Sequence, residues 1–258
     1  MTDNRFLMNL SWELKNLFRF PFPEILLALF TFTVFLPHVS TYSADINLND
    51  VSSQEITGQI AHVSTYQGAF ASVSAYLPLA VLGSIFGTLA FAYEIENGLL
   101  MVHLSHPTSK RAVFLSKWLS CFLVAFVTLS CTLLFFTFLY VPENSFYLIT
   151  NSHLTLSLML LAAMETFVIV SVTVSFSIFS RKASVSLVGS FATLYILQLL
   201  SQTSGLSYLP PASFYSQVEL LFHAGSLSML FNSSISLVFA AFLAVASYLY
   251  FSRRLELA

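Results

Sequence analysis

Charged side chains gather in one short stretch, residues 94–117, which lies between two long apolar blocks. The stretch contains three of the ten Lys and Arg residues of the chain, and the carboxylates of Glu94 and Glu96 open it. Its polar part is too short for a domain and too charged for a lipid bilayer. We therefore expect a connector that lies in water, where its charges contact a partner or merely cap a solvated helix.

The common signatures of catalytic sites are absent from the sequence. It has no Walker A pattern, no HExxH, no nucleophile elbow and no zinc-binding Cys/His cluster. His103 and His106 lie three apart and form a possible metal pair, but no third ligand is nearby, so we expect interface histidines. Cys121 and Cys131 lie ten apart in one apolar block, where a disulfide within one helix is sterically impossible. We expect neither an enzyme nor a metal or cofactor on this chain.

A second candidate is Glu165, a carboxylate about a dozen residues into an apolar block. A charge at membrane depth costs at least about 2.5 kcal/mol, so this side chain should face protein, water or a partner, or be protonated. It could line a translocation path. It could equally hydrogen-bond a neighbouring span, for example at Ser130, Thr132 or Ser171, and hold the spans together. Gln198 is a weaker candidate of the same kind.

The composition explains why these polar residues stand out. Of 258 residues, 57% are hydrophobic and only 9% are charged, whereas soluble domains carry about 25% charged residues. The chain is therefore an integral membrane protein. Its formal net charge of -2 implies no polyanion partner, and we expect no contact with nucleic acid. The polar lead before the first apolar run is too long for a cleavable signal peptide, so we expect this run to remain in the protein.

The apolar blocks predict a single all-α membrane domain, residues 1–258, with six transmembrane helices. A short re-entrant or external helix is expected in residues 201–225, where Pro210 and Pro211 break the pattern. Gly83 and Gly87 lie four apart, a spacing that lets helices approach closely, although they are equally well read as ordinary small residues. The predicted spans are 22–42, 68–93, 118–140, 154–179, 183–200 and 226–251.

An amphipathic helix is predicted before the first span, within residues 1–21. Its apolar side carries Leu7, Leu10, Leu14 and Leu17, and its polar side carries Arg5, Asn9, Glu13 and Asn16. This pattern is typical of a helix that lies in the membrane interface, where Trp12 suits the headgroup zone. Pro21 and Pro23 end it.

The distribution of positive charge predicts the orientation. All ten Lys and Arg residues fall before span one, between spans two and three, between spans four and five, or after span six. Because cytoplasmic loops carry the excess of Lys and Arg, both termini and residues 94–117 are expected in the cytoplasm. We expect a multi-pass protein of the cell (plasma or inner) membrane.

The spacing within residues 94–117 resembles the first cytoplasmic loop of type-2 ABC transporter permeases. The pattern is Glu-x-Glu-x-Gly, a Leu-rich turn, Pro-x-Ser-basic and then Lys. One position departs from it, since the family usually has Thr or Ser where this chain has Leu99. The amphipathic start is similar to the connecting helix of these permeases. The matching positions are Glu94, Glu96, Gly98, Leu100, Leu104, Pro107, Ser109, Lys110 and Lys117.

This resemblance implies a coupling helix between spans two and three, within residues 94–111, that docks on an ATPase. Residues 94–105 can form about three helical turns, which end before Pro107. Glu94 and Glu96 would be polar anchors, either to the partner or to the helix N-terminus, and Ile95, Leu99 and Val102 would share one face. The implied coupling residues are Glu94, Ile95, Glu96, Gly98, Leu99, Val102, Pro107, Ser109 and Lys110.

The function implied is that of the transmembrane subunit of an ATP-driven ABC exporter. ATP and Mg would then be held by a separate ATPase subunit, with two ATPase copies and a second permease copy or paralogue in a lipid membrane. An ATP-independent six-span secondary transporter or channel is the alternative, although that class favours internal repeats and more intramembrane charge. An intramembrane enzyme would need other polar groups beside Glu165. The sequence does not indicate the substrate.

Overall fold

The structure is a computed structural model of the whole chain, and its description covers the following residues: 3–17, 28, 75–101, 109–140, 152–201, 203, 206, 208–210, 213 and 233–254. These residues form helices and no strands, which confirms the all-α class. All of the predicted span at 22–42 except residue 28, and most of the predicted re-entrant segment at 201–225, lie outside the described residues.

Within the described ranges, five helices are long and apolar enough to cross a membrane. The turn between the helices Ser152–Ser180 and Ala183–Ser201 has the position predicted for the fourth connector. It consists of Arg181, in a left-handed conformation with φ 56°, and Lys182. The candidate spans are Tyr76–Glu96, Lys110–Thr132, Met159–Ser180, Ala183–Ser201 and Ser234–Arg253.

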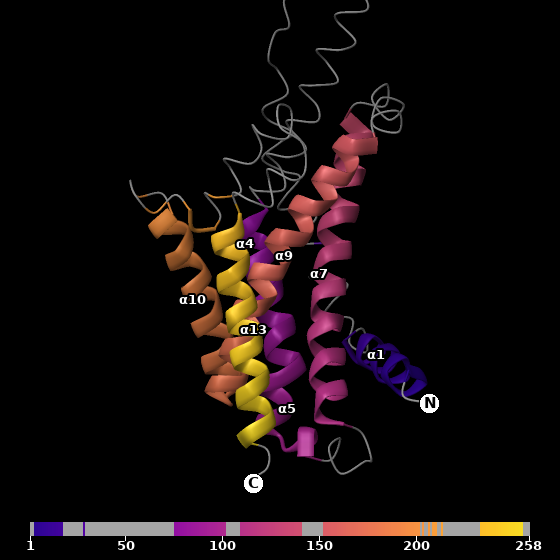
Figure 1. Cartoon of the computed structure of the whole chain (residues 1–258), viewed down its shortest axis with the longest axis vertical. Coiled ribbons are helices and arrows are strands. Elements are labelled where there is room, and N and C mark those ends of the chain that lie inside the picture. Colours follow the sequence, from indigo (N-terminus) through magenta and orange to yellow (C-terminus); the bar gives the residue numbers. More distant parts are fainter. Residues whose placement is uncertain are drawn as a thin grey trace, which may run out of the picture.

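The described elements are α1 (Asp3–Leu17), α4 (Tyr76–Gly87), η1 (Thr88–Ala92), α5 (Tyr93–Glu96), α7 (Lys110–Tyr140), α9 (Ser152–Ser180), α10 (Ala183–Ser201) and α13 (Ser234–Arg254). The elements α4, η1 and α5 are consecutive parts of one span. Helix α9 lies at the centre of the bundle, because it packs against α4, α7, α10 and α13 (Figure 1). Helix α1 packs crosswise beside the lower half of α7.

Buried hydroxyl groups join the central helix to its neighbours. The Ser177 hydroxyl lies 2.7 Å from that of Ser186 on α10, which lies 2.9 Å from the Thr88 hydroxyl on η1. On the opposite side, Ser247 of α13 donates to the Ser175 hydroxyl at 2.7 Å. In an apolar medium a hydroxyl without a partner is costly, so these contacts favour one arrangement of the helices.

Close contact between α4 and α9 depends on two glycines. A Cβ atom at Gly83 would lie 2.7 Å from Cγ2 of Ile169, and one at Gly87 would lie 3.0 Å from Oγ1 of Thr173. Neither position has room for a side chain without a shift of α9. The spacing of small residues therefore marks a helix contact here, as the first of its two interpretations predicted.

We expect Gly83→Ala to lower the free energy of unfolding by about 1–3 kcal/mol, the usual cost of overpacking. Alanine is the better helix former by about 0.5–1 kcal/mol, so the steric cost must exceed that gain. The measurement is SDS-induced unfolding of the purified protein in mixed micelles. Ile169→Ala should relieve the clash, so its cost should be smaller in the Gly83→Ala background than alone. A net gain in stability from Gly83→Ala would contradict the packing.

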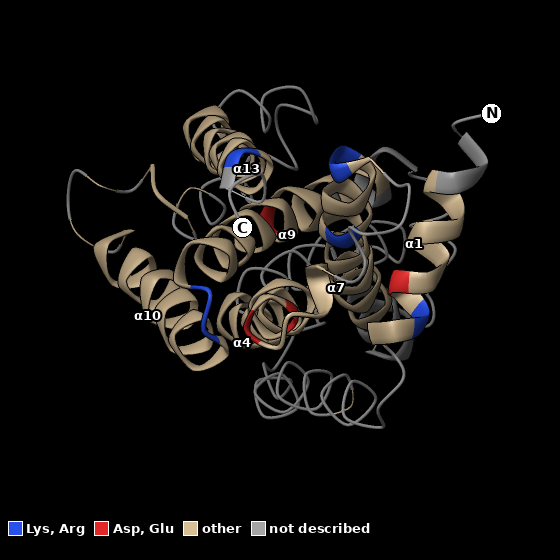
Figure 2. Ribbon diagram, turned by 90° about the horizontal axis from the view of Figure 1, so that it is seen from below, with Lys and Arg blue, Asp and Glu red and all other residues tan. Residues whose placement is uncertain are grey.

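Positive charge gathers at one end of the bundle. Figure 2, which views this end, shows the positions of Lys and Arg residues in blue on the ribbons of α1, α7 and α13 and at the turn before α10. The same end carries α5, the first turns of α7 and the end of α13 (Figure 1). Helix α1, the segment from α5 to the start of α7, the turn before α10 and the end of α13 are far apart in the sequence. They nevertheless meet at one side of the membrane domain.

Candidate functional site

The candidate site lies where span two ends, at the positively charged end of the bundle. The span does not end as a regular α-helix, because η1 is a π turn in which the Tyr93 amide donates to the Thr88 carbonyl. One turn of α-helix follows, α5, which ends at Glu96 and has Asn97 as its C-cap. The next residue, Gly98, has φ +71°, a left-handed conformation that glycine adopts without steric cost.

The break at Gly98 corrects one detail of the expected coupling helix. A continuous helix from residue 94 to residue 105 is interrupted there, and Leu99–Met101 begin a new helical segment. Ile95 and Leu99 therefore do not belong to one continuous helix. Ile95 is half-buried against the core, whereas the side chain of Leu99 is 45% exposed. Val102 and Pro107 lie outside the described residues, as do His103, Leu104 and His106.

Beyond the break, apolar side chains alternate between the interior and the surface. Leu100 is buried, while Met101 is exposed to nearly the same extent as Leu99. Ser109 is the N-cap of α7, because its hydroxyl accepts a hydrogen bond from the Ala112 amide at 3.2 Å. Lys110 is the first residue of α7 and is half-buried. The segment thus presents Leu99 and Met101 on the outside, next to a firmly anchored helix start.

A buried ammonium group holds this region together. Lys117, in the second turn of α7, is fully buried, and its Nζ lies 2.8 Å from Oε1 of Glu94. The same Nζ lies 2.9 and 3.0 Å from the two carboxylate oxygens of Glu13 on α1. We call Glu13, Glu94 and Lys117 the buried triad. It joins α1, α5 and α7 at one point.

One residue of the predicted polar side of the N-terminal helix is buried. Glu13 belongs to the predicted polar side, yet it is buried against α7, while Leu7 of the predicted apolar side is 59% exposed. Burial raises the pKa of the Glu13 carboxyl above its ordinary value of 4.5, and the neighbouring Lys117 ammonium opposes this shift. The carboxylate of Glu94 raises the same pKa further. Glu13 therefore faces protein because its charge has a partner there, and Leu17 of the predicted apolar side is buried on the same face.

Glu96, the second carboxylate of the stretch, contacts another helix. Its Oε2 accepts a hydrogen bond from the backbone amide of Ala183 at 2.7 Å. This amide is at the N-terminus of α10, where unsatisfied N–H groups and the helix dipole favour a negative charge. Glu94 and Glu96 thus fix the end of span two to α7 and α10.

Aromatic packing supports the same end from inside the bundle. The ring centroids of Phe91 on η1 and Phe114 on α7 lie 5.8 Å apart, and Phe251 of α13 lies 6.2 and 5.5 Å from them. Arg111 of α7 donates from Nε to the Tyr248 hydroxyl of α13 at 2.8 Å. The end of span two therefore contacts α7, α9, α10 and α13.

Glu165 lies far from this region, near the middle of α9. It is fully buried, and neither carboxylate oxygen has a hydrogen-bond partner among the described residues. The three hydroxyls named above as possible partners do not bind it. Thr132 donates to the Thr128 carbonyl, and the Ser130 and Ser171 hydroxyls have no partner within the described part of the chain.

The surroundings of Glu165 lie on the α4 and α10 side. Tyr76 of α4 is close enough for Glu165 to act on it electrostatically, and the Tyr76 hydroxyl donates to the Leu194 carbonyl of α10 at 3.4 Å. Gln198, one turn beyond Leu194, is half-buried, and its Oε1 has no partner among the described residues. The two intramembrane polar residues predicted from sequence therefore both carry polar atoms that the described fold leaves unsatisfied.

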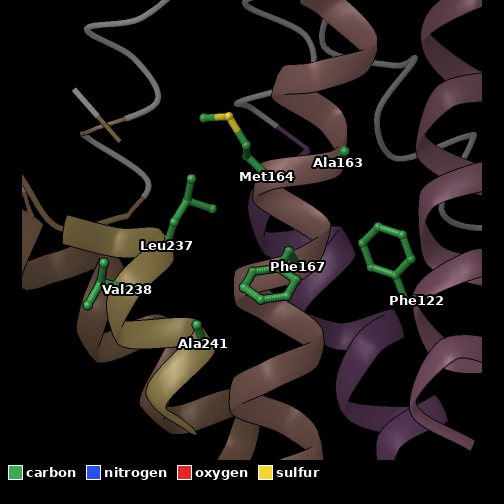
Figure 3. Close-up of a pocket in the computed structure, with 7 residues that line it drawn as sticks. All are labelled: Phe122, Ala163, Met164, Phe167, Leu237, Val238 and Ala241. Atoms are coloured by element: carbon green, nitrogen blue, oxygen red, sulfur yellow. The ribbon is translucent and has the colours of Figure 1, made fainter. Parts of the chain in front are cut away.

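An apolar groove of about 500 Å³ opens on the other side of α9, between α7 and α13 (Figure 3). Glu165 is not among its lining residues, so the groove and the buried carboxylate are separate features. The lining consists of Phe122, Ala163, Met164, Phe167, Leu237, Val238 and Ala241.

Lys117 and Glu13 are the residues of this site whose role sequence reasoning did not identify. Lys117 was recognised as part of the spacing pattern, but it was placed at the end of a water-exposed connector. One signal was available, because Lys117 is followed directly by a long apolar block. A lysine there, inside a helix, requires an anionic partner or access to water.

The comparisons with known proteins agree with the helical layout. Residues 11–254 match a family model described as "ABC-2 family transporter protein". Among curated proteins, none matches the chain.

Proposed function

This chain belongs to the ABC-2 family of transporter proteins, because the family model covers nearly its whole length, and we propose that it is driven by ATP and exports its substrate. Membership makes it a permease subunit of an ABC transporter, and such permeases generally pair with an ABC ATPase. ATP and Mg then bind to the separate ATPase, and this chain itself is not an enzyme.

The arrangement around residues 94–101 is the observation that carries this proposal. Leu99 and Met101 are exposed, while the residues before them are fixed to three other helices through Glu94 and Glu96. An exposed apolar pair at a polar end of the protein favours contact with another protein. Its anchoring means that a force applied there reaches α1, α7 and α10 directly.

The proposed orientation follows from the charges. The end that carries the Lys and Arg residues lies on the cytoplasmic side of the cell membrane. Both termini therefore lie in the cytoplasm. Helix α1 then lies at the cytoplasmic interface, with its exposed Leu7 and Trp12 toward lipid. We propose a complex of two permeases and two ATPases, in which Glu165 lines the translocation path.

The docking proposal predicts that Leu99→Asp weakens binding of the ATPase. Burying a leucine side chain contributes about 1.5–3 kcal/mol, so the dissociation constant should rise roughly 10- to 150-fold. Folding should persist, because Leu99 is half exposed in the isolated chain. The measurement is isolation of the tagged permease from its native membranes, followed by assay of ATP hydrolysis and of the co-purified ATPase.

Lys110→Gln is the matched control, since it removes a charge from a half-buried residue of the same region, and an ion pair with access to water contributes less than about 1 kcal/mol. It should leave binding nearly unchanged. Wild-type binding and transport in Leu99→Asp would show that the segment is only a connector. Transport by the purified permease with no ATPase present would contradict the function itself.

A further inference from the structure

The buried triad connects two parts of the chain that the proposed function treats separately. Glu94 belongs to the segment that contacts the ATPase, whereas Glu13 belongs to α1, which precedes the first span. Their carboxylates share the Nζ of Lys117 at 2.8 to 3.0 Å. Side chains 104 and 23 residues away from Lys117 in the sequence therefore meet at one atom.

Charge and burial make this connection difficult to break. The side chains of Lys117, Glu13 and Glu94 are 0%, 7% and 5% exposed. With little water to replace a lost partner, separating one carboxylate from the ammonium leaves an uncompensated buried charge. Movement of α5 relative to α1 is therefore resisted while both carboxylates hold Lys117.

The opposite side of α1 is exposed. Leu7, Met8 and Trp12 are exposed there, as is Ser11 between them. Only the face that carries Glu13 and Leu17 is buried among the described residues of α1. Because the buried face is held through Glu13, a shift of the triad is transmitted to the whole helix.

We propose that Lys117 and Glu13 are positioning residues, which transmit movement of the ATPase-docking segment to α1. This inference rests on the proposed function, since it requires an ATPase that moves the segment. In each ATPase cycle, Glu94 displaces the Lys117 ammonium, and Glu13 carries α1 with it. Helix α1 is thus a moving part of the coupling mechanism and more than a membrane anchor.

The test compares three substitutions on α1 in the complex with its ATPase. Glu13→Leu removes the link but leaves Lys117 paired with Glu94 at 2.8 Å, so the remaining buried pair is neutral. Glu13→Gln keeps an acceptor for the Lys117 ammonium. Lys15→Leu, the matched control, alters an exposed charge two residues away.

Two readouts separate transmission from stability. The first is substrate transported per ATP hydrolysed. The second is the mobility of a spin label at Ser11→Cys, in a background with Cys121→Ala and Cys131→Ala, with and without ATP and vanadate. Thermal unfolding of each complex gives the stability.

We expect Glu13→Leu to lower transport per ATP by at least about fivefold, the lower range of allosteric coupling, and to abolish the response of the label to nucleotide. Glu13→Gln should recover most of both, and Lys15→Leu should match the wild type. Normal coupling and a normal label response in a folded Glu13→Leu complex would overturn the inference and leave the proposed function standing. Failure of the wild-type permease to bind any ATPase would overturn both.

Discussion

Replacing Lys117 with methionine is expected to lower the free energy of unfolding by about 3–5 kcal/mol, the cost of removing one partner from a buried ion pair. Methionine fills similar space but leaves the carboxylates of Glu13 and Glu94 facing each other without a cation. Since domains are stable by only about 5–15 kcal/mol, this substitution should reduce the yield of folded protein strongly. SDS-induced unfolding in mixed micelles measures the loss.

The loss should depend on pH in a defined direction. Burial already raises the pKa of Glu13, and removal of the ammonium that opposes this shift raises it further. The folded variant then binds a proton more tightly than the unfolded chain, so its stability increases as the pH falls through the raised pKa. Lys15→Met, which changes an exposed lysine, should show neither the loss nor the pH dependence. A stable Lys117→Met protein at neutral pH would mean that the triad is not formed.

Glu165→Leu is expected to lower transport strongly while leaving the protein at least as stable as the wild type. A buried acid with no hydrogen-bond partner among the described residues lowers stability, so an apolar side chain of similar size should be tolerated well. The presence of a buried carboxyl that lowers stability is explained more simply by a role of Glu165 in transport than by a role in folding. If the acid contributes the 1–3 kcal/mol usual for coupling, transport should fall about 5- to 150-fold.

Two variants accompany this prediction. Glu165→Gln keeps hydrogen-bonding capacity and should fold normally, but it should change the stimulation of the ATPase by substrate. Thr166→Val removes the neighbouring buried hydroxyl, which donates to the Ala162 carbonyl, and should cost stability without affecting transport. A Glu165→Leu protein that transports normally would exclude Glu165 from the path. A Leu variant that unfolds would assign the residue a structural role.

The sequence predicted those features that depend on local pattern. Apolar length placed α10 within one residue of its observed bounds, and the Arg181–Lys182 turn follows from two charges between apolar blocks. Features that depend on a distant partner were not predictable. The polarity of Glu13 indicates a preference for water, but a lysine 104 residues away satisfies it inside the protein. Gly98 was recognised as part of a pattern, yet its left-handed conformation depends on where the preceding helix ends.

The π turn of η1 shifts the direction in which the side chains at the end of span two point. Each residue of an α-helix turns the chain by about 100°, and a π turn takes up one residue more than an α turn. Side chains after Ala92 therefore point about 100° away from the direction that a helical wheel drawn from Tyr76–Gly87 assigns to them. Deleting one residue from the π turn would restore a regular α-helix and leave Glu94 facing Lys117. Converting the turn to α-helix without a deletion would instead rotate Glu94 by about 100° away from Lys117. The register of this span, as much as the identity of its acidic residues, thus sets which side of the helix carries the ion pair.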